Sequence, residues 1–308
     1  MTEWMVGVST GCCWKESIFS CFEPIKRAGF QQIEVCSHPG HLDYHDVRLD
    51  QCAARLIRSL ELEAYSFHAP FREEIDITSL DTDARTRAKT ELLFAADAAA
   101  MLGAKYFVLP AGPEKTELQD RERLERLGNA ARVLEDAYTH CHSIGIKLVL
   151  ENMLPHLFAG RTDNLLWLLE TLHKSDLGMC LDTGHAFLGR YLLDTARRFS
   201  NRLTMIHASD NHGHWDEHLP PGEGEIVWPA LLRQLRDLRF AGMFILEVAG
   251  LDDQRTALAR ARRGKEYLQR VDGIARAKLP AIQSTRRTRP GSSRRPAGPV
   301  SRRTGRRR

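Results

Sequence analysis

Short apolar runs rich in β-branched and aromatic residues recur along the chain, and segments with helical spacing lie between them. Runs of about 4–8 such residues bounded by turn residues are typical of strands that are buried on both faces. The runs that fit this description are residues 5–9, 32–36, 64–68, 106–109, 147–151, 178–182, 203–207 and 243–248.

Between these runs, apolar residues return every three or four positions, which predicts amphipathic helices. One series covers residues 88–102 and stops at Gly103, a residue suited to the end of a helix. A second series covers residues 124–141 and is expected to end at Gly145. Thr162 has a side chain that is expected to cap the start of a further helix.

Strands that alternate with helices predict right-handed βαβ units and a parallel sheet. Eight units within roughly 270 residues match a (β/α)8 TIM barrel. An open doubly wound sheet is the alternative, but the glycines at positions 7 and 11 lack the GxGxxG spacing found after the first strand of nucleotide-binding sheets. We therefore expect one α/β barrel domain over residues 1–275 and a separate tail over residues 276–308.

The charge of the chain is unevenly distributed. The whole chain has 44 Lys and Arg against 40 Asp and Glu, but residues 284–308 contain ten Arg and no acidic residue. The rest of the chain therefore holds 34 basic and 40 acidic residues. This excludes a barrel that binds nucleic acid through a basic surface, and leaves only weak polyanion binding by a tail whose composition predicts disorder.

Membrane insertion and secretion are not predicted. The most apolar stretch, residues 92–102, is short and is interrupted by Asp97. The first residues lack the basic and apolar regions of a signal peptide. Seven cysteines without paired CxxC spacing are most simply reduced thiols. These features predict a cytoplasmic protein.

Ionisable residues close five of the predicted strands: His68, Glu151, Asp182, His207 and Glu247. In a barrel, the C-terminal strand ends meet on the face where barrel enzymes do chemistry. Carboxylates that end apolar strands are costly to bury unless a cation or another partner neutralises them. We expect Glu151, Asp182, His207 and Glu247 to bind one divalent metal ion. Oxygen-rich ligands favour Mn²⁺, Mg²⁺ or Co²⁺, with Zn²⁺ as the alternative.

A second polar cluster follows the seventh run. Asp216 and His218 stand two residues apart, a pair that can bind another metal ion or orient a polar ligand. His212 and His214, earlier in the same segment, are interpreted as residues of a solvated loop.

These motifs resemble the xylose isomerase-like TIM-barrel superfamily, which contains sugar and sugar phosphate isomerases and epimerases together with endonuclease IV. The matching pieces span residues 5–250 and keep one order along the chain. They are Phe67-His68-Ala69-Pro70, Leu150-Glu151-Asn152, Leu181-Asp182-Thr183-Gly184-His185, Ile206-His207-x-x-Asp210-Asn211, Asp216-x-His218-x-x-x-Gly222-Glu223-Gly224 and Leu246-Glu247.

The resemblance implies one of two branches. In the epimerase branch, residues matching Glu151, Asp182, His207 and Glu247 hold the metal ion, and the two glutamates face each other across the substrate. The endonuclease branch binds three zinc ions and also uses residues that match His68, His185, Asp216 and His218. That branch carries a histidine at the end of the fourth strand, where this chain has Pro110.

The favoured interpretation is a metal-dependent isomerase or epimerase of a keto-sugar, sugar phosphate or related polyol. Glu151 and Glu247 would exchange protons with the substrate through an enediolate that the metal ion stabilises. His68 and His185 would hydrogen-bond oxygens of the substrate, and Asp216 and His218 are expected to help bind it. A sugar dehydratase, an abasic-site endonuclease and a non-catalytic sugar-binding barrel are the alternatives, and a homodimer is left open.

Overall fold

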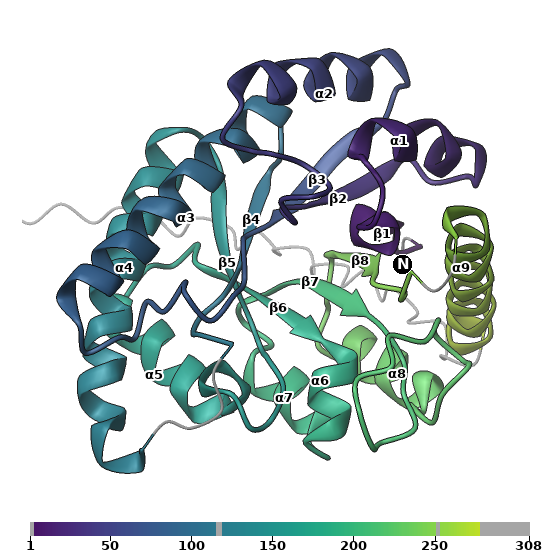
Figure 1. Cartoon of the computed structure of the whole chain (residues 1–308). Helices are drawn as coiled ribbons and strands as arrows, with labels where there is room; N and C mark the ends of the chain where they lie inside the picture. The colour runs from purple at the N-terminus through teal and green to yellow at the C-terminus, as the bar shows by residue number, and fades with distance from the viewer. Residues whose placement is uncertain (1–2, 115–118, 251–252, 278–308) are drawn as a thin grey trace, which may run out of the picture.

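The computed structural model describes residues 3–114, 119–250 and 253–277. Parallel strands pair in sequence order from β1 to β8, and β8 pairs with β1, so that the sheet closes into a barrel (Figure 1). This confirms the predicted (β/α)8 fold. The strands are β1 (Val6–Ser9), β2 (Gln32–Cys36), β3 (Glu63–His68), β4 (Tyr106–Pro110), β5 (Lys147–Glu151), β6 (Gly178–Asp182), β7 (Leu203–Ala208) and β8 (Met243–Leu246).

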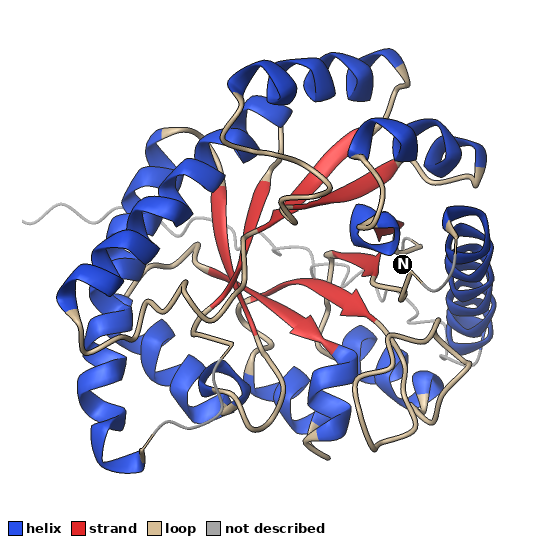
Figure 2. Ribbon diagram, viewed as in Figure 1, coloured by secondary structure: helices blue, strands red, loops and turns tan. Residues whose placement is uncertain are grey.

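Helices form a ring around the barrel (Figure 2). The α-helices are α1 (Ile18–Arg27), α2 (Val47–Ser59), α3 (Thr82–Leu102), α4 (Arg123–Ser143), α5 (Thr162–Leu172), α6 (Thr183–Leu188), α7 (Leu192–Arg198), α8 (Trp228–Asp237) and α9 (Gln254–Ala277). Short 3-10 helices lie in three connections, at η1 (Thr10–Cys13), η2 (Asp120–Glu122) and η3 (Phe158–Gly160).

The structure confirms one predicted helix end, places another two residues earlier, and contradicts one predicted helix cap. Gly103 follows the last residue of α3 in the left-handed conformation, with φ of 83°, as expected. Helix α4 ends two residues before Gly145, which also has a positive φ. The prediction that Thr162 caps α5 is wrong, because Thr162 is the first helical residue and Arg161 precedes it without a side-chain capping bond.

Two apolar layers stabilise the barrel. The larger lies between the strands and the surrounding helices. The smaller, here called the lumen layer, fills the inside of the barrel with Tyr65, Val108, Val149, Cys180, Met205, Met243 and Ile245. Alternate strand residues share a face, and four lumen residues stand two positions before a predicted site residue. The lumen layer therefore lies directly beneath the C-terminal strand ends.

Several expectations concern other parts of the chain. Among the described helices, none combines the length and apolarity needed to cross a membrane. All seven cysteines are free thiols. The predicted tail lies outside the described residues, apart from the last two residues of α9, so its boundary and its properties stay predictions.

Candidate active site

Four of the predicted residues converge at the C-terminal end of the barrel. Glu151 ends β5, Asp182 ends β6, His207 lies in β7 and Glu247 follows β8. One ligand atom from each of these residues lies within 4.8 Å of the others. The register that pairs Asp182 with His207 brings two of these side chains together on adjacent strands. The closed sheet thus assembles the group that the sequence predicted.

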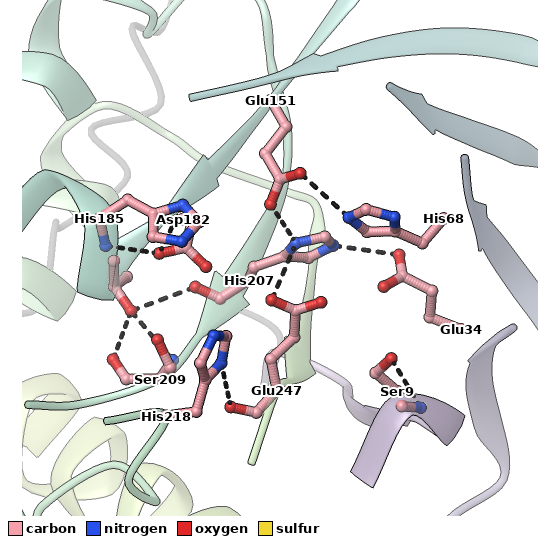
Figure 3. A network of polar contacts seen from close by, with 12 residues as sticks. Ser9, Glu34, His68, Glu151, Asp182, His185, His207, Ser209, His218 and Glu247 are labelled. Atoms are coloured by element: carbon pink, nitrogen blue, oxygen red, sulfur yellow. Dashed lines mark hydrogen bonds and ion pairs between the residues drawn. The ribbon is translucent and has the colours of Figure 1, made fainter. Parts of the chain in front are cut away.

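The imidazole of His207 occupies the centre of the group (Figure 3). Its Nδ1 atom lies 2.7 Å from Oε1 of Glu151 and 3.4 Å from Oε2 of Glu247. Its Nε2 atom lies 3.0 Å from Oε2 of Glu34. Each ring nitrogen therefore faces a carboxylate, and His207 connects the two glutamates of the predicted site to a third.

Glu34 is a residue of the site that the sequence pattern did not predict. This residue lies inside β2, is fully buried, and accepts a hydrogen bond of 2.7 Å from the hydroxyl of Ser66 on β3. A signal was present, because Glu34 is a carboxylate between the apolar residues Ile33 and Val35 of a short predicted strand. Only the closed barrel brings it to His207, 173 residues away in the chain.

Side-chain bonds tie the strand ends together. The Asn152 amide donates to the carbonyl oxygen of Asp182 at 3.1 Å and accepts from its backbone N–H at 2.9 Å. The Thr183 hydroxyl lies 3.1 Å from the carbonyl oxygen of His207 and 2.7 Å from that of Ser209. These bonds explain why Asn152 and Thr183 stand beside the predicted ligands: they fix the backbone on which Asp182 and His207 are mounted.

His68 lies on the opposite side of Glu151 from Asp182 (Figure 3). Its Nε2 atom is 3.2 Å from Oε2 of Glu151, and its Nδ1 atom is 2.8 Å from the carbonyl oxygen of Ala69. Because both ring nitrogens face acceptors, both contacts are satisfied together only when the ring is protonated. Burial opposes that charge, but the bond to Glu151 raises the pKa of His68 to about 9.

A second group of potential ligands adjoins the first. His185 Nε2 lies 3.2 Å from Oδ2 of Asp216, and His218 Nε2 lies 2.9 Å from the same oxygen. Ligand atoms of the three residues lie within 4.8 Å of one another. The backbone N–H of His185 also donates a hydrogen bond of 2.7 Å to Asp182 Oδ1, which links the two groups. The predicted pair of Asp216 and His218 is thus completed by His185.

The loop that carries Asp216 and His218 is held by the buried carboxylate of Asp210. Its Oδ1 atom accepts from the backbone N–H groups of Asn211 and Ile226, both at 3.0 Å. Its Oδ2 atom accepts from the N–H of Gly222 at 2.9 Å and from Nε1 of Trp228 at 2.8 Å. These four bonds of the carboxylate therefore hold the loop and the start of α8 in place.

The glycines of the Gly222-Glu223-Gly224 motif fit the same loop. Gly222 has a φ of 90°, which favours glycine. A Cβ atom on Gly224 would lie 2.4 Å from Asp210 Oδ1 and 2.6 Å from the carbonyl oxygen of Asn211. The motif is thus explained by the close packing of this loop.

The two glutamates of the first group differ in their electrostatic environments. Burial raises the pKa of Glu247 to about 7, and repulsion by Glu151 and Glu34 adds to the effect. Although Glu151 is also buried, the neighbouring imidazoles of His207 and His68 hold its pKa well below the usual range. Burial raises the pKa of Asp182, with repulsion from Asp216 and Glu151 contributing. Glu247 and Asp182 therefore hold a proton more tightly than Glu151 does.

The residues fit a divalent cation. Asp182 Oδ2 is buried and has no hydrogen-bond partner, and Asp216 Oδ1 in the second group is in the same condition. A buried carboxylate oxygen without a partner is costly, and a cation removes that cost. Three carboxylates and one imidazole form a donor set that suits Mn²⁺, Mg²⁺ or Co²⁺, and zinc is also compatible with it.

The barrel and the arrangement of its strand ends define a class of protein. Residues 22–271 match the xylose isomerase-like TIM barrel family, and the chain belongs to this family.

Relatives within the family carry different names. An uncharacterized protein of Methanocaldococcus jannaschii is 28% identical over 274 residues, which cover 86% of this chain and 90% of that protein. A probable endonuclease 4 of Mycobacterium leprae is 25% identical over 185 residues, covering 56% of this chain and 68% of the relative. A solved structure of a D-tagatose 3-epimerase-like protein superposes with a TM-score of 0.78 at 26% identity, covering 89% of this chain and 99% of that one.

Proposed function

We propose that the protein is a metal-dependent isomerase or epimerase of a keto-sugar, a sugar phosphate or a related polyol. The observation that carries this proposal is the pair of glutamates, Glu151 and Glu247, that approach His207 Nδ1 from different strands beside Asp182. Similarity to a D-tagatose 3-epimerase-like protein supports the same chemistry. The substrate would be a small molecule that enters from the C-terminal face of the barrel.

In this proposal Glu151, Asp182, His207 and Glu247 hold one divalent ion. A bound ion would supply positive charge for the oxygens of the substrate and stabilise the enediolate. Glu151 and Glu247 would act as the acid and base, one removing the proton next to the carbonyl group and the other returning a proton. His68, His185, Asp216 and His218 would bind and orient the hydroxyl groups of the substrate.

The test is a proton-exchange assay with purified protein and Mn²⁺. Ketoses, their phosphates and inososes are incubated in D₂O, and ¹H NMR follows the loss of the signal next to the carbonyl group. A substrate of the predicted class exchanges this proton and yields an isomer or epimer. A product that has lost water would identify a dehydratase. Absence of exchange with every compound, in protein that binds the metal ion, would contradict the proposal.

Variants of the two glutamates sharpen this assay. Glu247→Gln and Glu151→Gln each remove a proton carrier and should lower kcat by about 10²- to 10⁴-fold. Glu247→Gln should still bind the sugar. Glu63→Gln is the matched control, because Glu63 begins β3 at the other end of the barrel and pairs with Lys105. Full activity in Glu247→Gln would refute its assignment.

A second candidate function is a metal-dependent endonuclease that acts at abasic sites. The group of His185, Asp216 and His218 favours it, together with similarity to a probable endonuclease 4. Against it, the end of β4 is formed by Leu109 and Pro110, which offer no side-chain ligand. About one bound ion per chain supports the isomerase, whereas two or three zinc ions with incision of abasic DNA would establish the endonuclease.

A further inference from the structure

Among the described carboxylates that contact His207, Glu34 is the one that the proposed metal site does not use. It is fully buried in β2, and its Oε2 atom lies 3.0 Å from His207 Nε2 and 2.7 Å from the Ser66 hydroxyl. Its Oε1 atom is buried and has no hydrogen-bond partner. A buried carboxylate with an unpartnered oxygen lowers stability, so a benefit elsewhere is expected for retaining it.

The geometry around His207 indicates that benefit. The Nδ1 atom faces Glu151 and Glu247, so it is the nitrogen that a metal ion in the group would bind. A neutral imidazole carries one N–H, and an ion on Nδ1 requires this hydrogen to be on Nε2. Oε2 of Glu34 stands where it accepts that hydrogen bond. A carboxylate in this position fixes the tautomer and the ring orientation and makes the ligand nitrogen more basic.

Glu34 is itself held in place. In the register of β2 and β3, Glu34 stands opposite Ser66. The Ser66 hydroxyl donates a hydrogen bond to Glu34 Oε2, the same oxygen that faces His207. The oxygen is therefore fixed from one side by β3 and directed toward β7 on the other. Glu34 is also absent from the group of four whose ligand atoms lie within 4.8 Å of one another. Its action on a bound ion consequently passes through His207.

We propose that Glu34 is a positioning residue that holds His207 in the tautomer and orientation needed for metal binding, and so sets the affinity of the site. This inference rests on the metal site of the proposed function. Beyond that function, the inference assigns a role to Glu34, a residue that would touch neither the ion nor the substrate.

Metal affinity is the first measurement, because it needs no substrate. Mn²⁺ binding to the purified full chain is titrated by EPR in the unaltered protein and in two variants. Glu34→Gln keeps an oxygen that can accept from both Ser66 and His207 but loses the charge. Glu34→Leu removes the acceptor altogether. Loss of an outer carboxylate typically costs about 10- to 100-fold in affinity, so we expect about 10-fold for Gln and about 100-fold for Leu.

A spectroscopic measurement separates positioning from a general structural role. ¹⁵N-labelled protein saturated with Zn²⁺, which is diamagnetic, is expected to show His207 with its hydrogen on Nε2. Glu34→Gln should keep this tautomer, whereas Glu34→Leu should lose it or the bound ion. Because Gln is close in shape to Glu, its affinity decides the proposal even if Glu34→Leu does not fold.

The matched control is Asp50→Asn. Asp50 is another buried carboxylate with an unpartnered oxygen, but it lies on α2, outside both groups of potential ligands. Its Mn²⁺ affinity should stay within about twofold of the unaltered protein, as expected for a distant site. A Glu34→Gln variant that binds Mn²⁺ as tightly as the unaltered protein would overturn the role of Glu34 alone. Absence of Mn²⁺ binding by the unaltered protein would overturn the proposed metal site itself.

Discussion

Replacing Asp210 by Asn should destabilise the protein strongly while changing only one atom. The Asp210 carboxylate accepts four N–H bonds of 2.8–3.0 Å, two on each oxygen. Whichever way the Asn amide turns, two of these donors face an NH₂ group instead of an oxygen. A hydrogen bond to a charged group contributes about 1.5–3 kcal/mol, so the free energy of unfolding should fall by about 3–6 kcal/mol.

Thermal and urea denaturation followed by circular dichroism measure this effect. At about 2 °C or more per kcal/mol, the melting temperature should fall by about 6 °C or more. Asp237→Asn is the control, because Asp237 is exposed at the end of α8 and its replacement should change stability by less than about 0.5 kcal/mol. The reasoning is refuted if Asp210→Asn melts within 2 °C (roughly 1 kcal/mol) of the unaltered protein.

Three further predictions concern stability. Burial and two neighbouring aspartates raise the pKa of Asp50 to about 7. Its contribution to stability is therefore complete below about pH 4, the pKa of an aspartate in the unfolded chain, and is lost as the pH rises toward 7. Melting curves should therefore show Asp50→Asn gaining stability over the unaltered protein between pH 5 and pH 8, by about 1–2 kcal/mol; a constant difference would contradict this. Asp272→Asn breaks a buried ion pair with Arg236, whose Nη2 atom lies 2.7 Å from both carboxylate oxygens. Urea denaturation should show a loss of about 3 kcal/mol in the free energy of unfolding. The same loss should be measured in 0.5 M salt (roughly a 4 Å screening length), because the pair is buried. Gly224→Ala should lower the melting temperature, because the added Cβ would collide with backbone atoms. Gly273→Ala in α9 should instead stabilise the protein by about 0.5–1 kcal/mol, because a Cβ there meets nothing within 4 Å. Equal effects of the two substitutions would refute the packing argument.

The strands could be predicted closely because each is a short apolar run with clear ends. Strands β2, β5 and β6 have the predicted bounds, and the others differ by one or two residues. The ionisable residue at the end of a run was informative because parallel strands in a barrel all present their C-terminal ends on one face. Glu151, Asp182 and His207 could therefore be grouped before any distance was known.

Contacts that depend on closure of the barrel could not be predicted in this way. Glu34 lies two residues before the end of β2, so a rule based on strand ends passes over it. Its partner His207 is brought near by the pairing of β1 with β8 and by the shear of the sheet, which local sequence does not specify. The contact between His185 and Asp216 likewise depends on a loop whose path is set by Asp210.

The lumen layer has a consequence for the order in which molecules enter and leave. It lies beneath the site with apolar side chains, so the polar groups above it are reached from the C-terminal end of the barrel. The exposed fraction of the side chain is 0% for His207, 14% for Glu247 and 33% for His218. In the proposed enzyme the ion would sit beside the least exposed of these side chains, so it would bind before the sugar and be covered while the sugar is bound. Metal release should then be slowest when the enzyme is saturated with substrate.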